Sequence, residues 1–433
     1  MSKENWPQYI ALLNKEVVPA LGCTEPITVS LAAARAAETL GTLPERVEVR
    51  VSGNLLKNGM GVGVPGTGTT GLEVAAAVGV TGGKSSLALE VLRDLSEEQV
   101  KLGKQMLANG KVEISIAETD EVLYADVTVY AGEENARCVI AREHTAIVLV
   151  EKNGETVLSV DQAASEEVEE EWPMSMRDIL EFATSAPLED ISFILEAARL
   201  NEAAAVEGLN SDWGLRVGRS MDKDLAMGLR SDDVVSYAIK LTAAASDARM
   251  EGAPVPVMSN SGSGNQGITA TLPVVAFAHR RDASEEDLVR ALIMSHLTAI
   301  HLKHHLGRLS ALCGASLAAT AAGCGIVLLL GGGMEEMEST IRNTLGDIAG
   351  MVCDGAKTSC ALKVASCVEA AISGAFLAMK GISVPGKDGI LDEDIEACIR
   401  NIGRLGSVGM AETDKVILDI MTSKSNSSST EAV

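Results

Sequence analysis

Hydrophobic residues recur with helical spacing at both ends of the chain. In residues 6–18 apolar side chains return every three or four positions, which predicts a helix that Pro19 ends. Residues 24–40 continue with the same spacing and predict a second helix. From residue 175 onward the pattern is almost entirely helical and rich in alanine, leucine and methionine.

The segment between these helical stretches contains the pattern of strands. Residues 46–52 alternate apolar and polar side chains, as a half-buried strand does. Residues 86–109 predict one or two helices. Residues 111–158 form the clearest β region, and Asn153-Gly154 within it is a typical hairpin turn.

The sequence therefore predicts an α+β protein that is mostly helical. We expect a helical domain formed by residues 1–41 together with 161–425, and a smaller α+β domain, residues 42–160, inserted between its two parts. The acidic run 165–171 marks a linker or a solvated helix after the insertion. The Ser/Asn-rich tail, residues 426–433, is expected to be disordered.

Composition narrows the classes of function. Of 433 residues, 46% are hydrophobic and only 3% aromatic, so the core must be aliphatic. The net charge of −24 argues against nucleic acid and against an anionic membrane surface as partners. The first residues lack the pattern of a signal peptide, and the apolar run IVLLL is too short to cross a bilayer. We therefore expect a cytoplasmic protein whose eight cysteines are free thiols.

Two glycine-rich segments formally contain the dinucleotide pattern G-x-G-x-x-G. One lies in residues 53–71 and the other in 255–267. Neither has the flanking strands and helices that a dinucleotide fold requires, and Pro65 interrupts the first. Each instead predicts a polar loop. The first could hold a small carboxylate or be a flexible connection, and the second suits a carboxylate or a phosphate. The candidate substrate-binding residues in these loops are Asn54, Asn58, Ser259, Asn260, Ser261 and Gly262.

The histidines give weaker evidence for a functional site than the glycine-rich segments do. We expect His144, in the β region, to be a surface strand residue. His301 and His305 have the i, i+4 spacing of zinc ligands, but the glutamate of the H-E-x-x-H pattern is absent. Together with His296 and His304 they predict a partly exposed, histidine-rich helix face.

Three cysteines lie among small residues in the last third of the chain. Cys313 is in SALCGAS, and Cys353 and Cys360 bound the segment CDGAKTSC. In a reducing compartment, such a set can hold a soft metal or an iron–sulfur cluster. A structural role is the alternative, because Cys353, Cys360 and Cys367 recur every seven residues and would line one buried helix face.

Cys23 lies at the predicted start of the second helix, in LGCTEP, where it or Thr24 can cap the first turn. The N–H groups and the dipole of a helix N-terminus favour a thiolate over a thiol, which predicts a reactive group. The alternative is a small residue at a tight corner between two helices.

Four motifs together resemble one family. LGCTEP, NLLKNGMGVGVPGTG, SNSGSGNQG and CDGAKTSC are similar to those of the L-cysteine desulfidase family, within the iron–sulfur L-serine dehydratase alpha-chain superfamily. The resemblance covers nearly the whole chain, and LGCTEP and CDGAKTSC are its most specific parts. Close bacterial relatives often carry only an uncharacterised-family label.

The resemblance implies that the helical domain is catalytic and binds a [4Fe-4S] cluster with one open iron. The implied ligands are Cys313, Cys353 and Cys360, and Cys324 or Cys367 could replace one of them. Cys23 would remove the α-proton of a small amino acid, and Thr24 beside it would contact that substrate.

The implied reaction is elimination of sulfide from L-cysteine, which gives pyruvate, ammonia and hydrogen sulfide, in a homo-oligomeric enzyme. Two other functions fit the same residues. One is dehydration of L-serine at the same site, which differs in losing a hard rather than a soft leaving group. The other is a metal-free binding or regulatory protein of the same fold.

Overall fold

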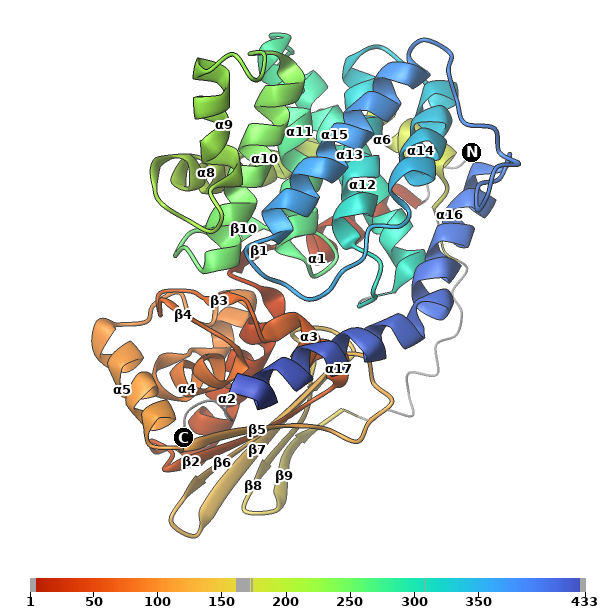
Figure 1. Ribbon diagram of the computed structural model, residues 1–433. Helices are drawn as coiled ribbons and strands as arrows, with labels where there is room; N and C mark the ends of the chain where they lie inside the picture. The colour runs from red at the N-terminus through yellow and green to blue at the C-terminus, as the bar shows by residue number, and fades with distance from the viewer. Residues whose placement is uncertain (1–4, 161–171, 173, 308, 429–433) are drawn as a thin grey trace.

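The computed structural model describes residues 5–160, 172, 174–307 and 309–428. The chain folds into a large helical part and a smaller part built on a sheet, and α17 (Ala411–Ser428) runs from the first towards the second (Figure 1). The fold is α+β and mostly helical, which confirms the predicted fold class.

The sheet of the smaller part has its strands in the order β5-β2-β6-β7-β8-β9. β2 and β5 run parallel, and the other neighbours in this sheet are antiparallel. The strands are β2 (Arg46–Val51), β5 (Val112–Ile116), β6 (Tyr124–Ala131), β7 (Glu134–Ala141), β8 (Ile147–Lys152) and β9 (Glu155–Ser159).

Alternation along these strands reflects a sheet that is covered on one face. In β2 the side chains of Val47, Val49 and Val51 are buried, whereas those between them are partly or fully exposed. Asn153 and Gly154 both have positive φ, as the central residues of a type I′ turn do. This confirms the predicted hairpin turn, which joins β8 and β9.

Helices rich in alanine and valine cover the inner face of the sheet. α2 (Thr24–Leu40) packs against α4 (Leu72–Gly82) and also contacts β6 and β7. The two helices approach closely because Gly79 has no side chain: a Cβ atom there would lie 2.7 Å from the Ser30 carbonyl oxygen. α5 (Glu97–Ala108) packs on α4, and α3 (Gly53–Gly59) lies towards the helical part.

The helical part is built around α13 (Gly314–Leu329), which contacts α11, α12, α14 and α15. The first half of α13 carries mostly small side chains, so its neighbours can pack closely. The other elements of this part are α1 (Trp6–Glu16), α6 (Met176–Ser185), α7 (Leu188–Ile191), α8 (Leu195–Asn210), α9 (Val217–Ala226), α10 (Val234–Glu251), α11 (Gly264–Arg280), α12 (Glu285–Leu306), α14 (Met334–Ile348), α15 (Cys360–Ala378) and α16 (Ile395–Arg404).

Several short elements join the two parts. β1 (Pro19–Leu21) pairs antiparallel with β10 (Pro256–Met258). The hairpin of β3 (Gly63–Val64) and β4 (Thr69–Thr70) contacts α10. A π-helical turn, η5 (Leu405–Gly409), leads from α16 into α17, which packs on α3. The 3-10 turns are η2 (Ser85–Glu90) and η4 (Ser192–Ile194).

The second helix packs differently from what the sequence analysis expected. Its buried side chains, such as Ile27 and Leu31, belong to the core of the smaller part and not to that of the helical part. The spacing of apolar residues identifies the buried face of a helix but not the element that covers it. By this packing the smaller part begins near residue 20 rather than 42. The division of the chain into domains remains a proposal.

Two expected irregular segments contain regular structure. Residues 53–71 hold α3 and the β3–β4 hairpin instead of one continuous loop. The tail expected from residue 426 begins inside α17, which extends to Ser428. The rest of that tail, and the acidic run 165–171, lie outside the described residues.

Among the described helices, only α15 is long and apolar enough to span a membrane. It packs against α10, α13 and α14, and its buried side chains belong to the core of the helical part. A core helix meets the same criteria of length and composition, and this packing is that of a core helix.

Candidate functional site

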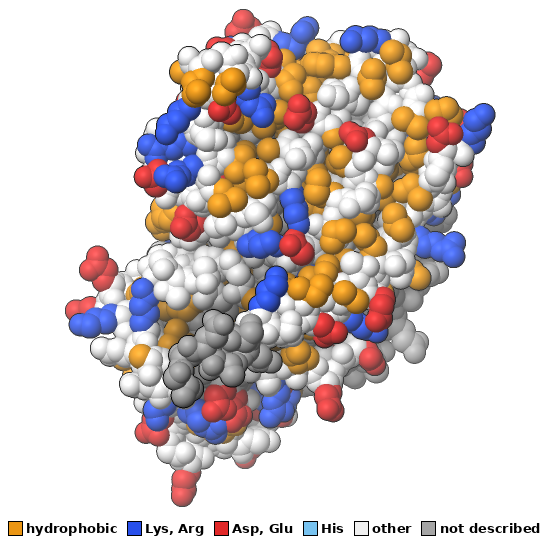
Figure 2. Space-filling model, viewed as in Figure 1, with side chains coloured by type: hydrophobic (Ala, Val, Ile, Leu, Met, Phe, Trp, Pro, Cys, Tyr) orange, Lys and Arg blue, Asp and Glu red, His pale blue; other side chains and the backbone are white. Residues whose placement is uncertain are grey.

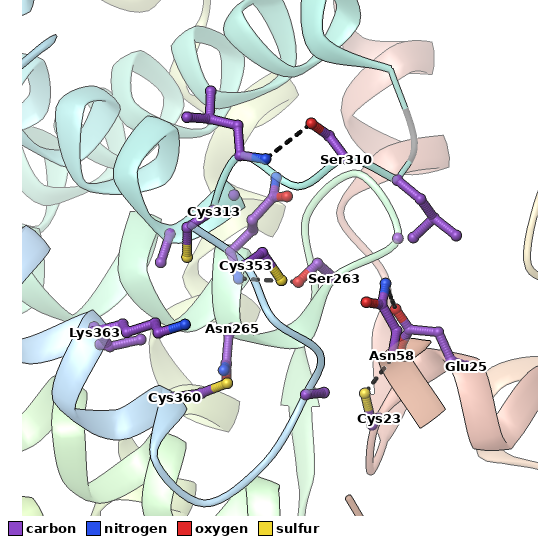
Figure 3. Close-up of a pocket in the computed structure, with 18 of the residues that line it drawn as sticks. Cys23, Glu25, Asn58, Ser263, Asn265, Ser310, Cys313, Cys353, Cys360 and Lys363 are labelled. Atoms are coloured by element: carbon purple, nitrogen blue, oxygen red, sulfur yellow. Dashed lines mark hydrogen bonds between the residues drawn. The ribbon is translucent and has the colours of Figure 1, made fainter. Parts of the chain in front are cut away.

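A cavity of about 100 Å³ lies where the two parts meet. Figure 3 shows its side chains converging from segments far apart in the sequence. Its size suits a small polar molecule and is far below what a dinucleotide needs. The lining residues that carry polar or reactive side chains are Cys23, Glu25, Asn58, His144, Arg249, Ser263, Asn265, Gln266, Lys303, Ser310, Cys313, Cys353, Cys360 and Lys363.

Four helices begin at this cavity. Cys23, Ser263 and Cys313 are the N-caps of α2, α11 and α13, and Cys360 is the first residue of α15. The N–H groups of a first helical turn have no partners within the helix and carry partial positive charge. The cavity is therefore favourable for negatively charged groups such as thiolates and carboxylates.

Backbone pairing holds Cys313 and Cys353 side by side. The Cys313 N–H donates to the Met351 carbonyl at 2.9 Å, and the Cys353 N–H donates to the Ala311 carbonyl at 2.7 Å. An isolated antiparallel bridge joins the two segments at this point. The main chain alone therefore brings together two cysteines that are forty residues apart.

The segment between Cys353 and α15 is organised by Asp354. Its carboxylate accepts hydrogen bonds from Lys357 at 2.7 Å and from Lys363. Partial burial opposes the charge of Asp354, but these two hydrogen bonds lower its pKa to about 2. The network holds Lys363 beside the cysteines that line the cavity.

This segment also rests directly on α3 of the smaller part. Gly355 has a φ of 90°, and a Cβ atom there would lie 2.3 Å from the Lys57 carbonyl oxygen. The Ala356 N–H donates to the Asn58 carbonyl at 3.2 Å. Only glycine permits this approach, which closes the cavity between the cysteine segment and α3.

The thiols of Cys313, Cys353 and Cys360, which line the cavity from the helical part, influence one another. Burial raises the pKa of Cys313 far above its usual range, and the nearby Cys353, Cys367 and Cys360 raise it further. Burial likewise raises the pKa of Cys360. The thiols can ionise together only when a positive centre lies among them. A bound metal supplies such a centre, because it deprotonates the thiols that it takes as ligands.

Cys313, Cys353 and Cys360 are the thiols of the helical part that line the cavity, and thiolates are the usual ligands of an iron–sulfur cluster. Across the part of the chain that the structure describes, no three His, Cys, Asp or Glu side chains lie close enough to hold one ion. A cluster instead offers separate irons to thiolates that lie farther apart. Cys324 and Cys367 are buried on α13 and α15 and do not line the cavity, although Cys367 lies near enough to Cys313 to raise its pKa.

Cys23 is held as a thiol in this structure. Its Sγ donates a hydrogen bond to Oε2 of Glu25 at 2.9 Å (Figure 3). Burial raises the pKa of Cys23 well above its usual range, and the Glu25 carboxylate raises it further. The prediction of a thiolate is therefore wrong here. The helix start is present, but burial and an adjacent carboxylate outweigh a dipole contribution of about 0.3–1 kcal/mol.

Glu25 carries the negative charge of this pair. Burial opposes that charge, but His144, the hydrogen bond from Cys23 and Arg249 together lower its pKa below the ordinary value. Its second oxygen, Oε1, accepts a hydrogen bond from Nδ2 of Asn58 at 3.1 Å. This bond fixes the orientation of the amide, so Asn58 keeps its carbonyl oxygen free. Within the described residues, that oxygen has no partner.

Within the described parts of the chain, one further buried amide lacks a hydrogen-bond partner and one buried guanidinium lacks an ion pair. Gln266 is 2% exposed, and its Nε2 makes no hydrogen bond. Arg249 is 3% exposed; its Nε donates to the Gly22 carbonyl at 3.1 Å, but no carboxylate there lies within ion-pair distance. An unpaired buried polar group costs about 1–3 kcal/mol, and an unpaired charge costs more. The pattern indicates a polar ligand in this cavity.

Among the predicted substrate-binding residues, Asn58 and Gly262 line the cavity. The others make hydrogen bonds within the fold and do not line it: Thr24 to Glu25 (3.2 Å), Asn54 to Asp414 (3.0 Å), Ser259 to the Val18 carbonyl (2.6 Å), Asn260 to the His296 carbonyl (3.2 Å) and Ser261 to Asn260 (2.8 Å). Ser259, Asn260 and Ser261 thus shape the turn that starts α11, whereas Ser263, Asn265 and Gln266 of the same loop line the cavity.

The expected histidine-rich face of α12 is only partly present: His304 is exposed and His305 half-buried, but the other two histidines are buried. His296 is fully buried, and burial lowers its pKa to about 3. His301 is also buried, where it accepts a hydrogen bond from Trp172 at 2.7 Å and contacts Glu396 at 2.7 Å. These contacts tie α12 to α16 and are structural.

Several site residues were not anticipated from the sequence. Glu25 and Gln266 lie inside LGCTEP and SNSGSGNQG, so the motifs themselves contained the signal. His144 is buried at the cavity, in the turn after β7, and is not the surface residue that was expected. His144 and Arg249 had no local signal, because only tertiary packing brings them to the cavity.

Comparisons with known proteins identify the family of this chain. A family described as serine dehydratase alpha chain matches residues 86–419, a range that includes Cys313, Cys353 and Cys360. A UPF0597 protein of Oleidesulfovibrio alaskensis is 62% identical over 98% of this chain and 100% of its own length. UPF0597 proteins of Bacteroides fragilis and Aeromonas hydrophila are 49% and 48% identical, over 98% of this chain and 100% and 97% of their own lengths. The chain belongs to the serine dehydratase alpha chain family.

Proposed function

We propose that this protein is an L-cysteine desulfidase that uses a [4Fe-4S] cluster in a non-redox elimination. The observation that carries the proposal is that Cys313, Cys353 and Cys360 line one cavity together with Cys23 and Glu25. Membership of the serine dehydratase alpha chain family supports a lyase and, at the level of the family, an iron–sulfur cofactor.

Cys313, Cys353 and Cys360 would hold the cluster. When bound, the cluster supplies a Lewis-acidic iron for the leaving group of the substrate. The chain offsets the negative charge of three thiolates with Lys363 and with the starts of α13 and α15. The segment that carries Cys353 is also braced against α3, which keeps these thiols at the cavity wall.

Cys23 and Glu25 form the proton-accepting pair of the proposed reaction. Glu25 is ionised and already accepts a hydrogen bond from the thiol, so it can take the thiol proton as Cys23 removes the α-proton of the substrate. The net movement is one proton from the substrate carbon to the Glu25 carboxylate. This pair replaces the preformed thiolate that the sequence suggested.

The electron pair left by the α-proton forms the new carbon–carbon double bond as the β-substituent departs. From L-cysteine, sulfide leaves with its bonding pair and the product is aminoacrylate. Aminoacrylate tautomerises to an imine, and one water molecule hydrolyses that imine to pyruvate and ammonia. The overall change consumes one water and needs no oxidant or reductant.

L-Serine dehydration is the second candidate, and the description of the matched family favours it. The same pair would remove the α-proton, while hydroxide would leave in place of sulfide. A metal-free binding or regulatory protein is the third, because the small polar cavity could hold an amino acid without turnover.

Anaerobically purified protein separates these functions. We expect about one cluster per chain from iron and acid-labile sulfide, and faster release of sulfide from L-cysteine than of pyruvate from L-serine. A higher kcat/KM for L-serine would assign the protein as a dehydratase. Protein without iron and without turnover of either amino acid would leave only the binding or regulatory function.

The cellular setting is part of the same proposal. We place the enzyme in the cytoplasm, where its thiols stay reduced. We also propose a homo-oligomer. Figure 2 shows hydrophobic side chains gathered over the helical part on the face in view, and Leu362 and Leu377 of α15 are 51% and 40% exposed.

A further inference from the structure

The cavity carries a charge opposite to that of the whole chain. Its lining includes one carboxylate, Glu25, and three cationic side chains, Arg249, Lys303 and Lys363, in a protein with a net charge of −24. Lys363 is paired with Asp354. Arg249, by contrast, has no ion pair within the described chain although it is 3% exposed. It lies near enough to Glu25 to lower the pKa of that carboxyl but forms no ion pair with it, so its guanidinium can take an anionic partner from outside the chain.

The position of Arg249 is fixed by its surroundings. Its Nε is bound to the Gly22 carbonyl, next to Cys23. A Cβ atom on Gly264 would lie 2.1 Å from the same Nε, so the guanidinium lies against bare backbone at the first turn of α11. The two terminal nitrogens of the guanidinium remain available to a ligand. They lie beside backbone N–H groups of the first turn of α11, which have no carbonyl partner within the helix.

The two unpartnered amide atoms have complementary chemistry. Gln266 offers a donor, Nε2, from the same first turn of α11, and this donor would extend the anion site of Arg249. Asn58 offers an acceptor, Oδ1, next to the Glu25 carboxylate, and together these would hold a cation. One wall of the cavity thus suits a carboxylate and the other suits an ammonium group.

We propose that Arg249 and Gln266 bind the α-carboxylate of the substrate, and that Asn58 and Glu25 bind its α-ammonium group. The inference rests on the proposed elimination from an amino acid and assigns the residues that select its substrate class. The ligand is a free α-amino acid with a short side chain. An amino-acid amide lacks the carboxylate that Arg249 requires, and no residue of a peptide carries both a free α-carboxylate and a free α-ammonium group. The arrangement would also place the α-carbon near Cys23, which shares the Glu25 carboxylate.

Ligand comparison tests this without turnover. Calorimetry on the anaerobic holoenzyme would use L-alanine, which has no leaving group, against L-alaninamide, which lacks the carboxylate, and propionate, which lacks the ammonium group. We expect L-alanine to bind at least about tenfold more tightly than either, as for loss of a charged hydrogen-bond partner. Equal binding of L-alanine and L-alaninamide, or no binding of L-alanine, would overturn the assignment.

Variants locate the carboxylate site. Arg249→Gln should weaken the binding of L-alanine by about 10- to 100-fold and leave the binding of ethylamine, which has no carboxylate, unchanged. Arg249→Lys should recover part of the lost affinity. Gln266→Met should weaken the binding of L-alanine less, by about 3- to 10-fold. Arg290→Gln, which removes a part-buried arginine of α12 outside the cavity, is the matched control and should change nothing. Unchanged binding in folded Arg249→Gln would contradict the proposal.

The outcomes separate this inference from the proposed reaction. Selective binding of L-alanine that Arg249→Gln abolishes, without turnover of L-cysteine or L-serine, would support the subsite and remove the reaction. Turnover with equal binding of L-alanine and L-alaninamide would keep the reaction and remove the subsite. If Arg249→Gln does not fold, the ligand comparison on the unmodified protein still decides.

Discussion

Lys57 of α3 and Asp414 of α17 form an ion pair across 357 residues of sequence. The Lys57 side chain is completely buried, and Asp414 is 14% exposed. The Nζ atom of Lys57 also lies 3.5 Å from the carbonyl oxygen of Cys353. One ammonium group thus connects the smaller part, the last helix and the segment that carries a proposed cluster ligand.

Breaking this pair should destabilise the protein strongly. Asp414→Ala would leave the Lys57 charge buried without a partner, which costs about 3–5 kcal/mol. Denaturant unfolding monitored by circular dichroism would measure the loss. Lys415→Ala is the matched control on the same helix, because its ion pair with Glu412 is exposed and should change stability by less than about 0.5 kcal/mol. A similar small effect for Asp414→Ala would show that α17 is not anchored by this pair.

The cluster assignment predicts a division among the cysteines. Cys313→Ala, Cys353→Ala and Cys360→Ala should each lose iron and the visible absorbance of the cluster, because each removes a thiolate ligand. Cys324→Ala should retain both, since Cys324 is buried on α13 away from the cavity. Iron content per chain, measured after anaerobic purification, decides. Full retention in the first three variants would remove the proposed ligand set.

Cys23 should serve catalysis and not cluster binding. Cys23→Ala is expected to keep the cluster and lose turnover by about 10²- to 10⁴-fold, the range typical of a missing acid–base group. Glu25→Gln should have a comparable effect, because the thiol proton would have no charged acceptor. Exchange of the substrate α-hydrogen with deuterated water should stop in both variants. Cys138→Ala, in the core of the sheet, is the control and should retain the exchange.

A Cys23→Ala protein that loses iron would instead identify Cys23 as a cluster ligand. One that keeps both iron and full turnover would show that the base lies elsewhere. These two results are distinguishable from a folding defect by the far-ultraviolet circular dichroism of the variant.

Stability should fall in mild acid because of His296. Burial holds its folded-state pKa at about 3, whereas an unfolded histidine titrates near 6.5. The unfolded chain therefore binds more protons below about pH 6.5, so stability decreases as pH falls from there towards 3. Between pH 7.5 and 5, the free energy of unfolding of the wild type should fall by about 2 kcal/mol more than that of His296→Gln. His279→Gln, at an exposed position of α11, should behave as the wild type. If the free energy of unfolding depended on pH in the same way for the wild type and His296→Gln, this prediction would be contradicted.

Local signals in the sequence were enough for elements whose structure depends on neighbouring residues. The alternation at Val47, Val49 and Val51 predicted the strand, and Asn153-Gly154 predicted the turn. Cys23 is at the N-cap position of α2, although its side chain makes no capping hydrogen bond. Such features are set by side chains within a few positions of each other.

Features that depend on long-range packing could not be predicted. The apolar face of α2 is compatible with either core, and only the fold shows that it covers the sheet. The prediction that Cys23 is ionised failed for the same reason. The start of α2 is a local feature of the sequence, but the burial of Cys23 and the orientation of Glu25 depend on tertiary packing. Arg249 reaches the cavity from the last turn of α10, where its neighbours in sequence give no sign of a ligand.

The junction between α3, the cysteine segment and α17 has a consequence for how the protein is made. Cys23 and Cys360 are 337 residues apart (360 − 23). Because ribosomes add about 5–20 residues per second, Cys360 is synthesised roughly 20 to 70 s after Cys23. α17, which locks the junction through Asp414, is translated later still. The cavity therefore cannot close on a nascent chain. Any cofactor it holds must be delivered to a protein that has left, or is leaving, the ribosome.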